Sequence, residues 1–218
     1  LPAQDSSQAI SGLIMALCNL NDRSHVLVSG NTPSHGYIKM SLNLYKKFGA
    51  VIVNMEDNSY KIEPAKFSPT FVGIESDWSA IAFLLVAGTI GGKVTVKNVF
   101  CNSLQPDKAI LKVLEMAGAN LLVQGSTLTI EQSELKAFDF DATNCPDLIP
   151  PLVALAINCK GTSRIKGVHR LKNKESDRAT ALVEEFSMIN AQIRILGDEL
   201  LVQESNLDGG VVSSRNDH

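Results

Sequence analysis

The chain has 218 residues, of which 44% are hydrophobic and 20% charged, values that are ordinary for a globular protein. Its formal net charge is −3, so no global basic character indicates a nucleic-acid partner. The longest apolar stretch, residues 80–90, is too short to span a bilayer. Four scattered cysteines lack metal-ligand spacing, and we expect reduced thiols and a cytoplasmic protein.

One plan recurs three times along the chain. Polar clusters that precede apolar helices contain Ser7, Asp77 and Asp147, which are 70 residues apart. A fixed period of this length predicts repeated supersecondary units, which we interpret as three βαββ-type modules. Within each module, an amphipathic helix should end at a pair of small residues before a strand. These pairs are Gly49-Ala50, Gly118-Ala119 and Asn190-Ala191.

The first repeat predicts a largely buried helix, a short strand, an amphipathic helix that Gly49 ends, and a hairpin. These elements are expected over 7–20, 26–28, 37–48, 51–53 and 60–62.

After a connector at 64–69, the second and third repeats follow the same plan. The second predicts helices over 77–89 and 107–117 and strands over 94–96, 121–123 and 128–130. The third predicts a buried helix that begins near Asp147, a long helix over 175–188, and strands over 164–165, 192–196 and 200–202. Buried helices that alternate with strands indicate layered α/β packing.

Ser6, Ser7 and Gln8 open the first buried helix. Two hydroxyls and a carboxamide at a helix N-terminus can hold a phosphate or a sugar hydroxyl. Serine also favours the N-cap position, so capping and ligand binding both explain this cluster.

Asp147 occupies the matching place in the third repeat, close to Asp139 and Asp141 and just before two prolines. A rigidly held carboxylate suits proton transfer or binding of a diol. A normal helix cap is the alternative explanation.

The sequence Asn173-Lys174-Glu175-Ser176-Asp177-Arg178 is the densest charged run in the chain. If it opens a helix, Lys174 and Arg178 lie on one face, which favours an anion between them. Glu175 could carry a proton beside these cations. A solvated helix start is the alternative, although the corresponding helix starts in the other repeats are much less charged.

Other patterns carry less information. The histidines His25, His35 and His169 show no metal spacing and indicate surface or strand positions. No Gly-rich dinucleotide loop, P-loop or nucleophile elbow is present.

These motifs, in this order, resemble the EPSP synthase family (3-phosphoshikimate 1-carboxyvinyltransferases), and the chain resembles a truncated central fragment of it. The matching residues are Ser6-Ser7-Gln8, Ser34 and Tyr37 before Leu42-Asn43-Leu44, Pro146-Asp147, the charged run 173–178, and Asn216-Asp217-His218.

The resemblance implies an α/β fold of the enolpyruvyl transferase type, an inside-out α/β barrel built from repeated βαβαββ units and only partly present here. Residues 1–73 would belong to the first lobe and residues 74–218 to the second. The implied reaction transfers the enolpyruvyl group of phosphoenolpyruvate to the 5-hydroxyl of shikimate 3-phosphate and releases phosphate, in chorismate and aromatic amino acid biosynthesis. Neither a metal nor an organic cofactor is implied, and the full-length enzyme is expected to be a monomer.

The resemblance also assigns roles to individual residues. Asp147 and Glu175 would transfer protons. Shikimate 3-phosphate would contact Ser6, Ser7, Gln8, Ser34, Tyr37, Asp147 and Lys174. Phosphoenolpyruvate would contact Gln8, Arg178 and His218. No role passes to Arg170. Because other basic clusters of the family lie outside these 218 residues, we expect the chain alone to be inactive.

Three alternatives remain open. One is the related enolpyruvyl transferase that acts on UDP-N-acetylglucosamine, which lacks the Ser-Ser-Gln and Lys-Glu-Ser-Asp-Arg patterns. The second is a non-catalytic repeat domain that binds an anion or a protein. The third is a scaffold without any ligand.

Overall fold

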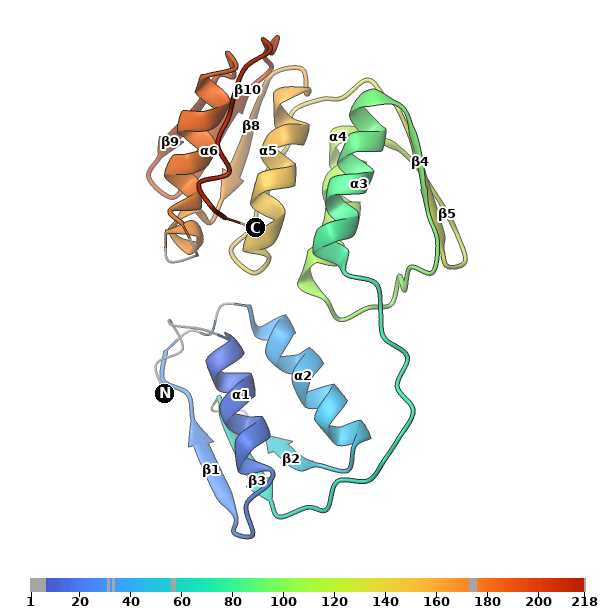
Figure 1. Ribbon diagram of the computed structural model, residues 1–218, viewed down its shortest axis with the longest axis vertical. Coiled ribbons are helices and arrows are strands. Elements are labelled where there is room, and N and C mark those ends of the chain that lie inside the picture. Colours follow the sequence, from blue (N-terminus) through green and yellow to red (C-terminus); the bar gives the residue numbers. More distant parts are fainter. Residues whose placement is uncertain (1–6, 31, 33, 56–57, 173–175, 218) are drawn as a thin grey trace. The chain divides into compact units, whose positions relative to one another are not determined.

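The computed structural model describes residues 7–30, 32, 34–55, 58–172 and 176–217 (Figure 1). The chain divides into two compact units, Leu1–Ile74 with Leu104–Pro106, and Glu75–Ser103 with Asp107–His218. The first unit contains one repeat and the second contains two. No described helix combines the length and apolarity needed to cross a bilayer.

The first repeat packs two helices against a three-stranded antiparallel sheet of order β1-β3-β2. Its core contains Ile10, Ile14, Ile38 and Tyr60. Residues 18–20 were predicted to be helical but lie beyond the helix, where Asn19 Nδ2 donates to Met15 O at 3.0 Å. The elements are α1 (Ser7–Leu17), β1 (Ser24–Leu27), α2 (His35–Lys47), β2 (Val51–Asn54) and β3 (Ser59–Glu63).

The second repeat has the same strand order, β4-β6-β5, again antiparallel. Helix α3 lies close to this sheet, because a Cβ added at Gly88 would be 2.7 Å from Ile130 Cγ2 and 2.9 Å from Val94 Cβ. The predicted helix over 107–117 begins as a 3-10 turn. The elements are α3 (Trp78–Gly91), β4 (Lys93–Val96), η1 (Pro106–Ala109), α4 (Ile110–Ala117), β5 (Asn120–Gln124) and β6 (Thr127–Glu131).

The third repeat keeps this order in β8-β10-β9 and adds β7 in parallel beside β8. Among the described residues, only this repeat shows the complete βαβαββ succession. The elements are β7 (Asp139–Asp141), η2 (Pro146–Leu148), α5 (Ile149–Ile157), β8 (Thr162–Lys166), η3 (Val168–Leu171), α6 (Arg178–Ser187), β9 (Ile193–Leu196) and β10 (Glu199–Gln203).

The small-residue pairs end the amphipathic helices as predicted. Gly49, Gly118 and Asn190 all have positive φ, at 99°, 82° and 68°. Glycine and asparagine tolerate this left-handed conformation, which lets the next N–H close the helix end. The following alanine donates to the carbonyl five residues earlier in every repeat: Ala50 to Tyr45, Ala119 to Leu114 and Ala191 to Phe186, at 2.9–3.0 Å.

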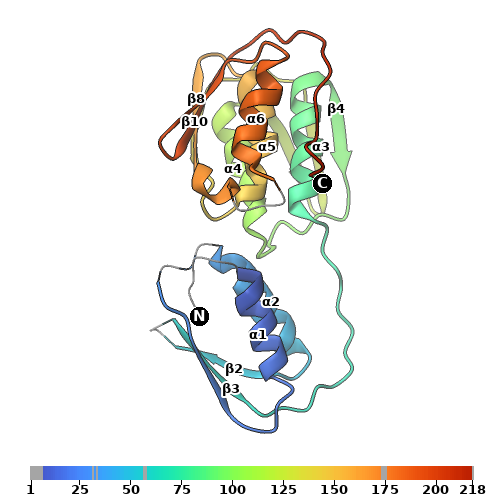
Figure 2. The ribbon, with the colours of Figure 1, turned by 60° about the vertical axis from the view of Figure 1, so that its left-hand side comes forward.

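One core joins the second and third repeats. Helix α5 contacts α3, β8 and β10, which Figure 2 shows around it, and α6 contacts β9. Consequently α5 is buried along almost its whole length, as its apolar sequence predicts.

One expectation about the third repeat was wrong, and one of its strands was not predicted. Helix α6 begins at Arg178 rather than at residue 175, because Asp177 adopts the N-cap position. The prediction that Lys174 and Arg178 share a helix face therefore has no support, and Lys174 lies outside the described residues. Strand β7 was not predicted, since its three residues gain their strand geometry only by pairing with β8.

Candidate active site

Asp147 lies in the turn η2 that leads into α5. Pro150 and Pro151 occupy the first turn of α5, where their missing N–H groups cost no intrahelical bond. The N-cap of α5 is Leu148, so Asp147 does not hold the capping position suggested as its alternative role. Its side chain is 36% exposed, and Oδ1 accepts a hydrogen bond from Arg178 Nη1 at 3.1 Å.

Arg178, which binds Asp147, is the first residue of α6. The helix starts here because Asp177 accepts hydrogen bonds from Thr180 N at 3.1 Å and Thr180 Oγ1 at 3.0 Å. The bond from the Thr180 backbone is the main cause that holds the pKa of Asp177 below its usual range. A charged cap at a helix N-terminus also interacts favourably with the helix dipole.

Asp217 holds the same guanidinium in a bidentate pair. Arg178 Nε donates to Oδ2 and Nη2 to Oδ1, each at 2.9 Å. Ser176 Oγ donates to Oδ2 at 2.6 Å. The side chains of Arg178 and Asp217 are only 14% and 10% exposed. A buried fork of this kind fixes both the position and the plane of the guanidinium.

The arrangement therefore places one cation between two carboxylates. Both ion pairs are at most partly solvated, so screening by water and salt is weaker than at the surface. Asp147 is the more exposed of the two carboxylates and is oriented by a cation that Asp217 immobilises. Chemically, this is a positioned acid/base beside a fixed positive charge, which suits proton transfer on an anionic substrate.

Cys145 lies two residues from Asp147 but does not supply a nucleophile. Burial, followed by the charges of Asp107, Asp141 and Asp147, raises the pKa of its thiol to about 12. The thiolate is the reactive form of cysteine, so at neutral pH this side chain remains a neutral part of the core.

Asp141 and Asp139 flank Phe140 on strand β7 and are separate from the Arg178 pairs. Asp141 Oδ1 accepts from Thr143 N at 2.9 Å, and its carboxylate lies 3.4 Å from Lys166 Nζ. The bonds from Thr143 are the first cause that lowers the pKa of Asp141. Asp141 therefore stabilises the start of the loop that follows β7, and it is not part of the Arg178 site.

The first unit carries the other described site candidates. Ser7 is the first residue of α1 and is half-buried, whereas Gln8 is exposed. Ser34 is buried at the N-cap of α2, with φ of 61°. Its backbone carbonyl accepts a hydrogen bond at 3.0 Å from the backbone N–H of Tyr37, a half-buried residue. A left-handed serine is uncommon and is often retained for a functional reason. Ser6, Glu175 and His218, like Lys174, lie outside the described residues.

Asp217 is the residue that the sequence interpretation missed. It stands inside the Asn216-Asp217-His218 motif, of which only His218 received a role. Asp217 is 39 residues from Arg178, so no local pattern links the two. The signal that could have found it is chemical: a carboxylate in a motif that was already expected to lie at the site.

Comparison with known proteins settles the family. Residues 2–218 match the family described as EPSP synthase (3-phosphoshikimate 1-carboxyvinyltransferase). The chain belongs to the EPSP synthase family.

Its relatives include proteins named 3-phosphoshikimate 1-carboxyvinyltransferase. One from Clostridium acetobutylicum is 37% identical and covers 100% of this chain and 51% of the relative. Another, from Clostridium novyi, is 36% identical, and the alignment covers 98% of this chain and 49% of the relative. The chain thus spans about half the length of these curated relatives.

A solved structure supports the fold assignment. The EPSP synthase from Acinetobacter baumannii superposes with a TM-score of 0.74 at 22% identity, covering 98% of this chain and 52% of that one. The enolpyruvyl transferase fold class inferred from the sequence is confirmed.

Proposed function

We propose that this chain is about half of a full-length EPSP synthase, and that the full-length protein transfers the enolpyruvyl group of phosphoenolpyruvate to the 5-hydroxyl of shikimate 3-phosphate. Family membership supports the reaction class. The chain spans half of its relatives, which supports the expectation that the 218 residues alone are inactive.

The observation that carries the proposal is the Asp147–Arg178–Asp217 arrangement. All three residues belong to motifs on which the family resemblance rests, yet they are widely separated in sequence. Arg178 Nη1 lies 3.1 Å from Asp147, and its Nε and Nη2 lie 2.9 Å from Asp217. This joins an acid/base and an oriented cation, the two groups that addition to an anionic enol phosphate requires.

In the addition step, the 5-hydroxyl oxygen bonds to C2 of phosphoenolpyruvate, the hydroxyl proton passes to a base, and C3 gains a proton. In the elimination step, a proton leaves C3 and the bond between C2 and the phosphate oxygen breaks. We assign Asp147 to the proton of the 5-hydroxyl and Glu175 to the proton of C3. Arg178 would hold the negative charge of phosphoenolpyruvate, together with Gln8 and His218.

The remaining candidates would bind shikimate 3-phosphate: Ser6, Ser7, Gln8, Ser34, Tyr37 and Lys174, besides Asp147. The two units would belong to two lobes, divided near residues 73 and 74. This division is supported by the boundary of the compact units, of which the first ends at Ile74 apart from Leu104–Pro106. We also propose that the full-length protein is a cytoplasmic monomer.

Phosphate release tests the reaction directly. The full-length protein should release phosphate from phosphoenolpyruvate only when shikimate 3-phosphate is present, and UDP-N-acetylglucosamine should not replace it. Release with UDP-N-acetylglucosamine would favour the related transferase. Binding of shikimate 3-phosphate without any phosphate release would favour the anion-binding domain.

A further inference from the structure

The C-terminal segment, residues 208–217, follows α6 from its C-terminal end to its N-terminal end (Figure 1). Asp208 N donates to Ile189 O at 3.0 Å, beyond the last turn of α6. At the other end, Asp217 pairs with Arg178, the first residue of the helix. No strand is assigned within the described residues 208–217, and side chains of α6 supply several of the polar contacts of the segment.

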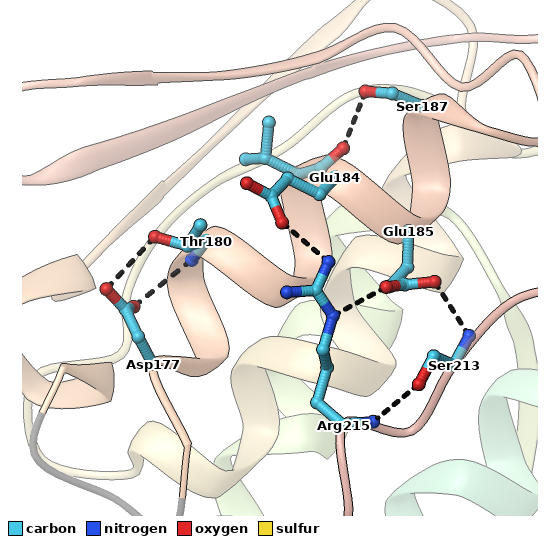
Figure 3. A network of polar contacts seen from close by, with 8 residues as sticks. Asp177, Thr180, Glu184, Glu185, Ser187, Ser213 and Arg215 are labelled. Atoms are coloured by element: carbon cyan, nitrogen blue, oxygen red, sulfur yellow. Dashed lines mark hydrogen bonds and ion pairs between the residues drawn. The ribbon is translucent and has the colours of Figure 1, made fainter.

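Glu185 makes the central contact between α6 and this segment (Figure 3). Its Oε2 accepts a hydrogen bond from the backbone N–H of Ser213, and its Oε1 accepts one from Arg215 Nε, both at 2.7 Å. The side chain of Glu185 is 9% exposed, and that of Arg215 is 40% exposed. Both carboxylate oxygens are therefore used to fix two residues of one loop.

Glu184 adds a peripheral contact to the same arginine. Arg215 Nη2 donates to Glu184 Oε2 at 2.6 Å, and the Glu184 side chain is 51% exposed. Among the described residues, the Glu184 side chain accepts no hydrogen bond from the backbone of the segment, unlike Glu185, which accepts one from Ser213 N–H. Glu184 thus offers a matched comparison: the neighbouring residue, the same charge and the same arginine partner, without the backbone contact.

The turn after Ser213 is conformationally restricted. Arg215 and Asn216 have φ of 55° and 56°, which is uncommon for two successive residues that are not glycine. Asp217 N donates to Ser214 O at 3.0 Å and closes the turn. Such a conformation persists only where its surroundings hold it. Here Ser213 and Arg215 are held by their hydrogen bonds to Glu185.

We infer that Glu185 is a positioning residue, which together with Arg215 holds the 213–217 turn so that Asp217 can orient Arg178. The chain of contacts runs from Glu185 to Ser213 and Arg215, through the turn to Asp217, and on to the guanidinium. The inference rests on the proposed function insofar as Arg178 binds phosphoenolpyruvate.

The test is Glu185→Gln in the full-length protein. Glutamine keeps the shape of the side chain but removes its charge. Its NH₂ group is a donor, so it cannot accept the hydrogen bond from whichever donor it faces, Ser213 N–H or Arg215 Nε–H. Glu184→Gln is the control. Two quantities are measured: the amide hydrogen exchange of residues 213–217, and the KM of each substrate.

For Glu185→Gln, exchange protection of 213–217 should fall by about tenfold or more, the scale of a lost charge-assisted hydrogen bond. The KM of phosphoenolpyruvate should rise about tenfold, while the KM of shikimate 3-phosphate changes less than about threefold. Glu184→Gln should change each of these quantities by less than about threefold.

Unchanged protection in Glu185→Gln would overturn the inference whatever the protein catalyses. Lost protection with equal changes in both KM values would show that the turn is purely structural and would also overturn it. A wild-type protein that does not use phosphoenolpyruvate would refute the proposed function. The inferred contact from Glu185 to the turn would then be judged by exchange alone.

Discussion

The first and third repeats share one strand order but differ in how their first helices are buried and in what their second helices carry. Helix α5 is almost completely buried, whereas α1 leaves Met15 49% exposed. In the second unit two repeats contribute to one core, and in the first unit one repeat forms its own. Helices in equivalent positions of the two repeats are therefore buried to different extents, because different elements surround them.

The second helices differ in chemistry as well. Helix α6 starts with Arg178 bound to two carboxylates, while α2 starts after a left-handed Ser34 without a side-chain cap. The strand order is common to all repeats, so it cannot determine function. The first and third repeats therefore differ in chemistry at the start of their second helices.

The largest contrast in stability should come from the first helices. Leu152→Ala in α5 removes a side chain with 0% exposure and should lower the free energy of unfolding by about 2–5 kcal/mol. Met15→Ala in α1 should cost less than about 1 kcal/mol, because that side chain is half exposed. Urea denaturation of the full-length protein measures both, and equal losses would remove the distinction between the two repeats.

Glycines with positive φ provide a second contrast. A Cβ at Gly167 (φ 108°) would lie 2.9 Å from Thr143 N and 3.1 Å from Thr143 Cα, so Gly167→Ala should cost about 2–4 kcal/mol. At Gly49 (φ 99°) the nearest atom is Lys66 O at 3.1 Å, and Gly49→Ala should cost about 1–2 kcal/mol. Thermal unfolding of the two variants measures which loses more stability, and a larger loss of stability in Gly49→Ala than in Gly167→Ala would contradict the prediction.

The capped helix α6 gives a smaller effect. Asp177→Ala removes both bonds to Thr180 and should lower the free energy of unfolding by about 1 kcal/mol. Asp177→Asn keeps an acceptor and should recover much of this loss, as urea midpoints at neutral pH would show. If the asparagine variant were as unstable as the alanine variant, the cap would act through charge alone.

The smallest expected effect is a pH dependence in the C-terminal segment. The Ser213 backbone N–H, and then Arg215, hold the pKa of Glu185 below its usual value of about 4.3. A lowered folded-state pKa means that this contribution is complete above the usual value and is lost as the pH falls through the folded-state pKa.

Exchange protection of Ser213, corrected for the intrinsic pH dependence of exchange, should therefore persist as the pH falls through the usual titration range of a glutamate, and it should be lost only below that range. Glu184 binds the same Arg215 that Glu185 binds, so Glu184→Gln is measured alongside, and it should keep the transition. Glu185→Gln should abolish the transition. A transition that survives in Glu185→Gln would belong to another carboxylate.

Most of the fold could be predicted from the sequence, because each repeat carries its own hydrophobic period and its own helix-ending pair. The exceptions have local causes. Strand β7 is short, with an aspartate at each end, and depends on a parallel partner more than 20 residues away. The start of α6 was misplaced because Asp177 was interpreted as part of a charged helical turn rather than as its cap.

The site was less predictable than the fold. The motifs pointed to Asp147 and Arg178 individually, and the structure brings these two together. The contribution of Asp217 depends on the path of the C-terminal segment along α6, which is a tertiary property. The same holds for Glu185, whose place in an amphipathic helix gives no indication of the loop that it holds.

The central claim is that Asp147 transfers a proton, and turnover of Asp147→Asn in the full-length protein tests it most directly. Asp139→Asn is the matched control, since Asp139 is an exposed aspartate on the neighbouring strand β7. We predict that Asp147→Asn lowers kcat by about 10²–10⁴-fold and changes the Kd of shikimate 3-phosphate by less than about threefold, while Asp139→Asn stays near wild type. A kcat for Asp147→Asn close to that of Asp139→Asn would contradict the account.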